Sequence, residues 1–148
     1  MKPIGARELL PLFGIITVAA YATMPSLYPA LPPLPLLAGV TLLVLAGAEV
    51  VLAQALRARI QRRPGARPVQ PLVAARAVSL AQASALAGAV MAGIWLGTLG
   101  YLLPRRAELA AVAQDTPAAV VGLISAAALV AAALWLQHCC RAPPSDDA

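Results

Sequence analysis

Residues 57–76 read RARIQRRPGARPVQPLVAAR, and this stretch decides how the rest of the chain is interpreted. It holds six of the eleven basic residues of the 148-residue sequence, and two long apolar segments lie on each side of it. Loops of membrane proteins that are rich in Lys and Arg stay in the cytoplasm. The stretch therefore predicts a cytoplasmic, Arg- and Pro-rich turn that joins two membrane hairpins.

The composition supports a membrane protein. Hydrophobic residues make up 61% of the chain and charged residues 11%, whereas soluble domains contain about 25% charged residues. We therefore expect an all-α integral membrane protein, with residues 1–148 as a single membrane domain. The net charge of +5 would suit nucleic acid in a soluble protein, but aromatic residues are scarce and the arginines gather in one loop. This pattern predicts no nucleic-acid partner.

Four apolar segments are long enough to be transmembrane helices, because a helix rises about 1.5 Å per residue and the hydrocarbon core is about 30 Å thick. The predicted spans are Leu9–Tyr28, Pro35–Leu56, Ala77–Leu103 and Ala118–Leu136. The loop between the second and third spans is Arg57–Arg76. The tail, Gln137–Ala148, contains prolines and ends in acidic residues, and we expect it to be disordered.

Prolines set the expected helix ends. Pro25 is predicted to end the first helix, and Pro71 is predicted to start the third. Thr116 and Pro117 have the residue types of an N-cap and a first helical position, so the fourth helix is predicted to begin there. The preceding outer loop, Arg105–Thr116, is then expected to hold a short surface helix over Ala107–Ala113.

The first span has a second interpretation as a secretory signal peptide, with Ala20-Tyr21-Ala22 as a small-residue cleavage site. In both cases the chain emerges outside the membrane. Nine basic residues then lie on the side of the central loop, against Arg105 and Arg106 on the other side. The positive-inside rule predicts a multi-pass plasma-membrane protein with both termini in the cytoplasm.

Glu49 is the one charged residue inside an apolar span. A carboxylate at that depth costs about 2.5 kcal/mol or more, so it must face protein or water or be protonated. Superposing the second and third spans about their turn places Glu49 near Gln82 and Ser84. We interpret it as a polar packing contact between those spans. The alternative is a proton or ion relay, although the span offers no second ionisable partner.

Small residues recur at helical spacing, as in Gly93-x-x-x-Gly97 and in the run from Ala118 through Gly122 to Ala126. Such motifs let helix backbones approach closely in lipid. We expect Gly93, Gly97 and Gly122 to pack helices within one chain, with homodimer formation as the alternative.

The central arginines are expected to fix the topology and to contact anionic lipids, since each basic residue near an anionic surface contributes about 1 kcal/mol. A docking surface for a membrane-protein partner is the alternative. The residues concerned are Arg57, Arg59, Arg62, Arg63, Arg67 and Arg76.

The sequence predicts no catalytic residue, no cofactor and no metal. His138-Cys139-Cys140 contains potential ligands, but two adjacent cysteines do not easily bind one metal and their disulfide is strained. The sequence holds no Ser/His/Asp arrangement, no paired carboxylates and no phosphate-binding glycine loop.

Four motifs resemble those of an uncharacterised actinobacterial family of small four-span membrane proteins, a domain of unknown function. They are LPPLP (31–35), the arginine-proline loop (57–76), YLLPRR (101–106) and DTP (115–117). The resemblance implies four spans and brings no activity or site residue. We expect a non-enzymatic structural or accessory subunit of a membrane complex. The alternatives are a small transporter or channel that uses Glu49 with Gln82 in a dimeric pore and, third, a membrane enzyme.

Overall fold

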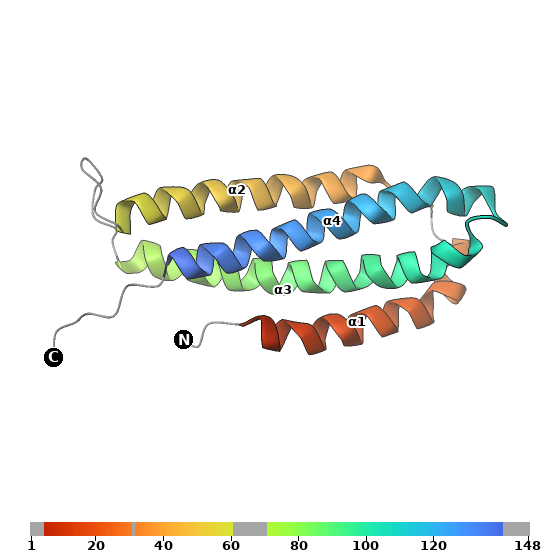
Figure 1. Cartoon of the computed structure of the whole chain (residues 1–148), viewed down its shortest axis with the longest axis horizontal. Coiled ribbons are helices and arrows are strands. Elements are labelled where there is room, and N and C mark those ends of the chain that lie inside the picture. Colours follow the sequence, from red (N-terminus) through yellow and green to blue (C-terminus); the bar gives the residue numbers. More distant parts are fainter. Residues whose placement is uncertain (1–4, 31, 61–70, 141–148) are drawn as a thin grey trace.

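The computed structural model describes residues 5–30, 32–60 and 71–140. In these ranges the chain forms long α-helices that lie side by side, together with two short 3-10 turns (Figure 1). The elements are α1 (Ala6–Leu27), η1 (Tyr28–Ala30), α2 (Leu36–Ile60), α3 (Pro71–Leu102), η2 (Leu103–Arg105) and α4 (Ala110–Cys139).

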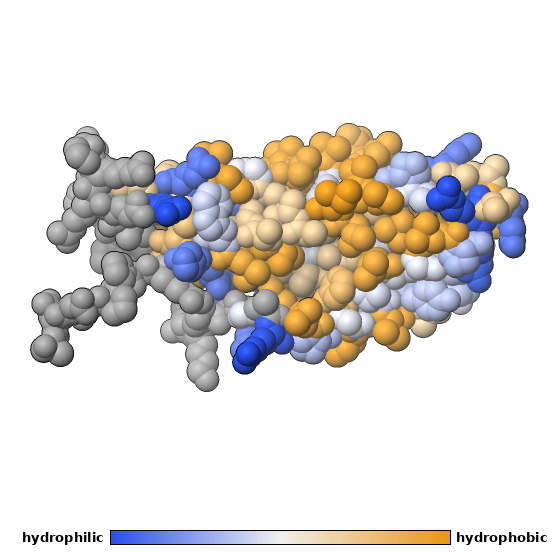
Figure 2. All heavy atoms as spheres, in the orientation of Figure 1, coloured by the Kyte–Doolittle hydropathy of each residue, from blue (hydrophilic) through white to orange (hydrophobic). Residues whose placement is uncertain are grey.

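All four α-helices are long and apolar enough to cross a membrane. Leu, Ile and Val side chains are exposed along them, and the face drawn in Figure 2 is apolar across its middle, with hydrophilic residues toward the ends. These observations confirm the predicted all-α, four-span class.

The helices run in alternating directions, and α3 and α4 form the centre of the bundle (Figure 1). Helix α1 packs on α3, helix α2 packs on α4, and α3 packs on α4. The second predicted hairpin is therefore a packed pair. The first predicted hairpin, α1 with α2, is not a packed pair, because these two helices follow each other in the chain but lie on opposite sides of the bundle. Helix α2 also makes few contacts with α3.

Glycines on α3 allow α1 to approach closely. A Cβ atom at Gly97 would lie 2.6 Å from the carbonyl oxygen of Thr17, and one at Gly93 would lie 3.0 Å from the carbonyl oxygen of Phe13. Any larger residue at these positions would push the two backbones apart. The structure thus places this small-residue motif at an interface within the chain.

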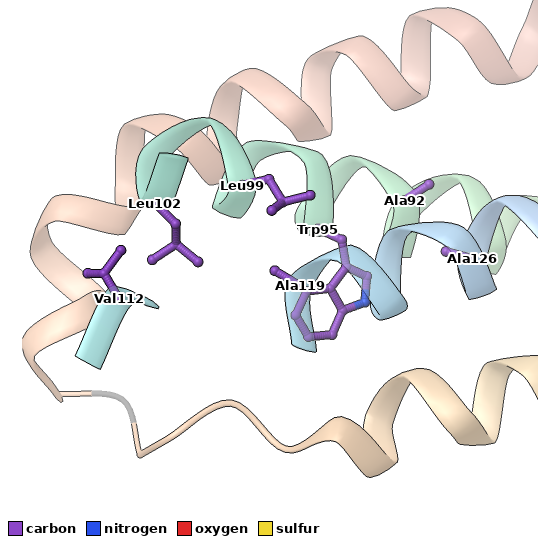
Figure 3. Close-up of a cluster of buried hydrophobic side chains, with 7 residues drawn as sticks. All are labelled: Ala92, Trp95, Leu99, Leu102, Val112, Ala119 and Ala126. Atoms are coloured by element: carbon purple, nitrogen blue, oxygen red, sulfur yellow. The ribbon is translucent and has the colours of Figure 1, made fainter. Parts of the chain in front are cut away.

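Gly122 has the corresponding role between α3 and α4. The indole of Trp95, which is 6% exposed, covers Gly122 so closely that a Cβ there would overlap the ring. Figure 3 shows Trp95 reaching from α3 across α4, beside Ala119. The same cluster of buried side chains extends to Leu102 and Val112 at the end of the bundle.

The predicted start of the fourth helix is wrong. Helix α4 begins at Ala110 and runs through Pro117, so the short surface helix and the fourth span form one element. Thr116 is not an N-cap, because its hydroxyl donates to the carbonyl oxygen of Val112 at 2.7 Å. The extra turns hold because Val112 is fully buried in the Trp95 cluster, which outweighs the cost of an internal proline.

Two other predicted helix ends also move. Pro25 does not end α1, which continues to Leu27. Helix α4 extends through Gln137 to Cys139, so these residues do not belong to a disordered tail. They are helical because Leu136 and Cys139 pack against α2 and α3. Residues 141–148 of the predicted tail lie outside the described residues.

We predict that Gly122→Ala destabilises the bundle, because its new methyl group must displace a buried indole, and overpacking typically costs about 1–3 kcal/mol. The measurement is thermal unfolding of the purified chain in detergent. Gly47→Ala on α2 is the control, since a Cβ at Gly47 meets nothing within 4 Å. The loss at Gly122 should shrink in a Trp95→Leu background. Equal melting temperatures for the two alanine variants would contradict this packing.

Candidate functional site

Glu49 lies in the middle of the buried face of α2. The buried side chains on this helix are spaced by three or four residues, at Ala46, Glu49, Ala53 and Leu56. This spacing places Glu49 on the side that packs against α4. The carboxyl side chain is 2% exposed, so the surrounding helices remove it almost completely from lipid.

Ser84 of α3 is the polar side chain that interacts with the Glu49 carboxyl group. It is buried, as the predicted contact requires. Neither Glu49 oxygen, however, has a hydrogen-bond partner of good geometry among the described residues. Gln82 is half-buried and has an interaction of its own, but two residues before Ser84 it projects from another side of α3. The structure therefore brings Glu49 and Ser84 together, and the predicted contact of Glu49 with Gln82 stays a prediction.

This arrangement can hold a proton but has few groups to pass it on. Glu49 is the only buried carboxyl group among the described residues. The buried hydroxyl of Thr98 donates to the carbonyl oxygen of Ile94 in its own helix. A relay needs a series of exchangeable groups at matching depth, and within the described ranges Ser84 is the side chain that interacts with Glu49.

The arginines of the central stretch divide into two groups. Arg57 on α2 and Arg76 on α3 are exposed at the end of the bundle where α2 ends and α3 begins, here called the loop end. Arg59 lies in the last turn of α2. Arg62, Arg63 and Arg67 lie outside the described residues.

A polar cluster that the sequence analysis did not predict lies at the opposite end of the bundle. The Tyr28 hydroxyl donates to Asp115 Oδ2 at 2.9 Å, and the backbone N–H of Leu34 donates to Asp115 Oδ1 at 3.1 Å. One carboxylate on α4 thus holds both the end of α1 and the connection to α2. We call Tyr28, Leu34, Tyr101, Arg105 and Asp115 the Asp115 cluster.

Aromatic contacts extend this cluster to α3. The rings of Tyr28 and Tyr101 lie 5.8 Å apart between centroids, a distance typical of aromatic pairs. The guanidinium carbon of Arg105 lies 4.1 Å from the centroid of the Tyr101 ring, and Arg105 Nη1 donates to the Tyr101 carbonyl oxygen at 3.0 Å. The cluster therefore joins three of the four helices at the end of the bundle opposite the loop end.

Three of the four motifs that carry the family resemblance meet in this cluster. Leu34 belongs to LPPLP, Tyr101 and Arg105 belong to YLLPRR, and Asp115 begins DTP. Sequence reasoning missed the site because it assigned Thr116 and Pro117 to a helix start and gave Asp115 no partner. A lone carboxylate near two tyrosines at headgroup depth was the available indication.

The two adjacent cysteines are free thiols. Burial raises the pKa of the Cys140 thiol, and the neighbouring Cys139 raises it further. Because the thiolate is the reactive form, a raised pKa makes Cys140 a poor nucleophile at neutral pH. Within the described residues, no three His, Cys, Asp or Glu side chains gather as metal ligands.

A bundle of four apolar helices, joined at one end by a carboxylate and carrying one buried carboxyl group at mid-span, defines a small four-span integral membrane protein. The chain belongs to the family described as protein of unknown function (DUF3180), whose model matches residues 9–144. Comparisons with curated proteins and with solved structures find no significant match. The family match confirms the resemblance and brings no activity with it.

We predict that Asp115→Ala lowers the free energy of unfolding by about 2 kcal/mol, because hydrogen bonds to charged groups contribute about 1.5–3 kcal/mol each. Tyr28→Phe, which removes one of the two donors, should cost about half as much. Thermal unfolding in detergent measures both. Glu108→Ala is the control, since Glu108 is an exposed carboxylate at the same end.

A double-mutant cycle between Tyr28→Phe and Asp115→Ala should show that the two losses are not additive. Additive losses would mean that the hydrogen bond between them does not stabilise the bundle.

Proposed function

We propose that this protein is a non-enzymatic structural or accessory subunit of a plasma-membrane complex, and that α2 provides the contact with its partner. The proposal is supported by the outer face of α2. Leu37, Val44 and Val51 are 73%, 67% and 67% exposed and recur every seven residues. Val40 and Gly47 lie between them and are also exposed.

This spacing is that of the a and d positions of a coiled coil, where a second helix packs along the seam. In lipid such a seam gains stability from van der Waals contact, and a glycine in it allows close approach. Helix α2 packs mainly on α4, so its opposite face is available to another helix. A helix of a different membrane protein is the occupant we propose.

The second candidate is a small transporter or channel, and Glu49 is the observation that favours it. A carboxyl group that is 2% exposed and whose oxygens accept no hydrogen bond from the described residues is costly for a purely structural contact. In this role Glu49 would bind and release a proton or a cation from within the bundle.

The partner test uses the open space at Gly47. A side chain there meets nothing within 4 Å, so Gly47→Leu should keep the melting temperature of the chain and yet block a helix that packs on the seam. We expect a tagged chain, extracted from its native membranes in mild detergent after photocrosslinking from Val44, to yield one partner membrane protein. Gly47→Leu should reduce its recovery at least five-fold.

Gly14→Leu on α1 is the matched control, since a Cβ at Gly14 also meets nothing within 4 Å. Equal recovery with both variants would contradict a partner site on α2. An adduct of twice the chain mass would assign the seam to a second copy instead.

Substitutions at Glu49 distinguish the two candidate functions. If Glu49 is a packing contact, Glu49→Gln should change the free energy of unfolding by less than about 1 kcal/mol, since hydrogen bonds between membrane helices average about 0.6 kcal/mol. Glu49→Leu should also be tolerated, because it removes a costly buried carboxyl group. Purified chain in liposomes should then conduct no protons. Proton flux that is present in the wild type and lost in a stably folded Glu49→Gln variant would establish the transporter.

The proposed location places both chain ends and the central loop in the cytoplasm, because nine basic residues lie on that side. In a background without Cys139 and Cys140, an impermeant thiol reagent added to intact cells should label Pro32→Cys and Ala111→Cys. It should not label Pro64→Cys. Labelling of Pro64→Cys from outside would reverse the orientation.

A further inference from the structure

A groove opens on the side of the bundle away from α2. It encloses about 370 Å³ between α1 and α4. Leu10 and Phe13 line it from α1, Ala131 and Leu134 line it from α4, and the small side chains of Ala89 and Ala92 on α3 also line it. The space exists because α1 packs mainly on α3 and meets α4 through few side chains, such as Leu9 beside Ala133. Since all of these residues lie within the membrane-spanning helices, the groove faces hydrocarbon.

Polar side chains continue the groove toward the loop end. His138 follows Leu134 by four residues and therefore lies on the same side of α4. Arg7 precedes Leu10 by three residues and lies on the same side of α1. Both side chains are exposed. The apolar groove thus leads to a cation on one wall and an imidazole on the other, toward the loop end of the bundle.

One acidic residue lies near this position. Glu8 is exposed beside Arg7, but successive residues of a helix are about 100° apart. Glu8 therefore projects about 160° away from Leu10, whereas Arg7 projects about 60° from it. Arg7 is consequently the charged side chain of α1 that borders the groove.

We propose that this groove is a binding site for one anionic phospholipid, with an acyl chain between α1 and α4 and the phosphate held by Arg7 and His138. The guanidinium group suits this role because its fork of N–H donors matches two phosphate oxygens. A helix of a second copy is the other occupant that the experiments below distinguish, because the groove is open on one side.

The test reconstitutes the full chain in nanodiscs of equal parts phosphatidylglycerol and phosphatidylcholine, extracts it in mild detergent and counts retained lipids by native mass spectrometry. We expect the wild type to retain one phosphatidylglycerol. Arg7→Gln should weaken its retention about five-fold, which corresponds to about 1 kcal/mol for one basic residue. Arg106→Gln, an exposed arginine at the other end, is the charge control and should have no effect.

The acyl chain is tested by filling the groove. Ala127 and Ala131 line it and are exposed to it, so the double variant Ala127→Leu, Ala131→Leu should fold normally and lose the lipid. Ala48→Leu and Ala55→Leu on the exposed face of α2 form the matched control. Retention by the filled variant, equal retention of phosphatidylcholine, or no retained lipid in the wild type would each overturn the proposal.

A second measurement does not depend on how the variants fold. A phosphatidylglycerol with a photoreactive acyl chain, added to the wild type in nanodiscs, should crosslink within 9–13 or 127–134. Crosslinks confined to α2 would contradict the proposed lipid site. A crosslinked dimer joined through residues 127–134 would show that a second copy occupies the groove.

Discussion

The close contact between α3 and α4 is the constraint on which the rest of the bundle depends. In lipid no hydrophobic effect drives helices together, so they associate by packing at short range. Here the indole of Trp95 covers Gly122, and a Cβ at Gly88 would lie 2.8 Å from Val130 on α4. Each of the two central helices then carries one outer helix: α1 on the glycines of α3, and α2 on α4, where Gly39 approaches Gly122. A shift between α3 and α4 would therefore move both outer helices.

Polar contacts set the register of the helices along one another, which apolar packing alone leaves undetermined. Apolar helices can slide along one another at little cost, whereas a hydrogen bond in a low-dielectric setting is costly to break. Asp115 binds the end of α1 and the start of the connection to α2 through two of its oxygens, and so it sets the register at one end. Glu49 and Ser84 lie far along the bundle from that cluster, where α2 and α3 otherwise barely meet. Of the two sites, the Asp115 carboxylate is the one whose hydrogen bonds fix the connection to α2.

The sequence was sufficient to predict the number, type and order of the helices, because apolar length and proline position report these directly. It also placed Glu49 near Gln82 and Ser84, because the positions that face each other in an antiparallel pair can be calculated from the turn, and the structure shows the interaction with Ser84. It did not predict that α1 packs on α3, because the spans have similar apolar surfaces and connection order alone favours the neighbour in sequence. It misplaced the start of α4, because local residue preferences at Thr116 and Pro117 are weaker than the burial of Val112. The Asp115 cluster depends on the packing of α1 and on the early start of α4. Because the sequence predicted neither, it did not predict the cluster.

The two outer helices differ in what they can bind, and the difference follows from how each is attached. Helix α1 leaves a gap beside α4 that is lined by leucine, phenylalanine, valine and alanine side chains and leads toward Arg7 and His138, a shape and charge suited to a lipid. Helix α2 packs along α4, and its opposite face exposes one leucine and several valines with a glycine among them. This surface is suited to another helix. Glu49 sits on the inner side of that same helix, facing Ser84 across the bundle. A partner that packed on α2 would therefore contact the outer face of the helix that carries the buried carboxyl group. Such a partner could alter the surroundings of Glu49 without touching it.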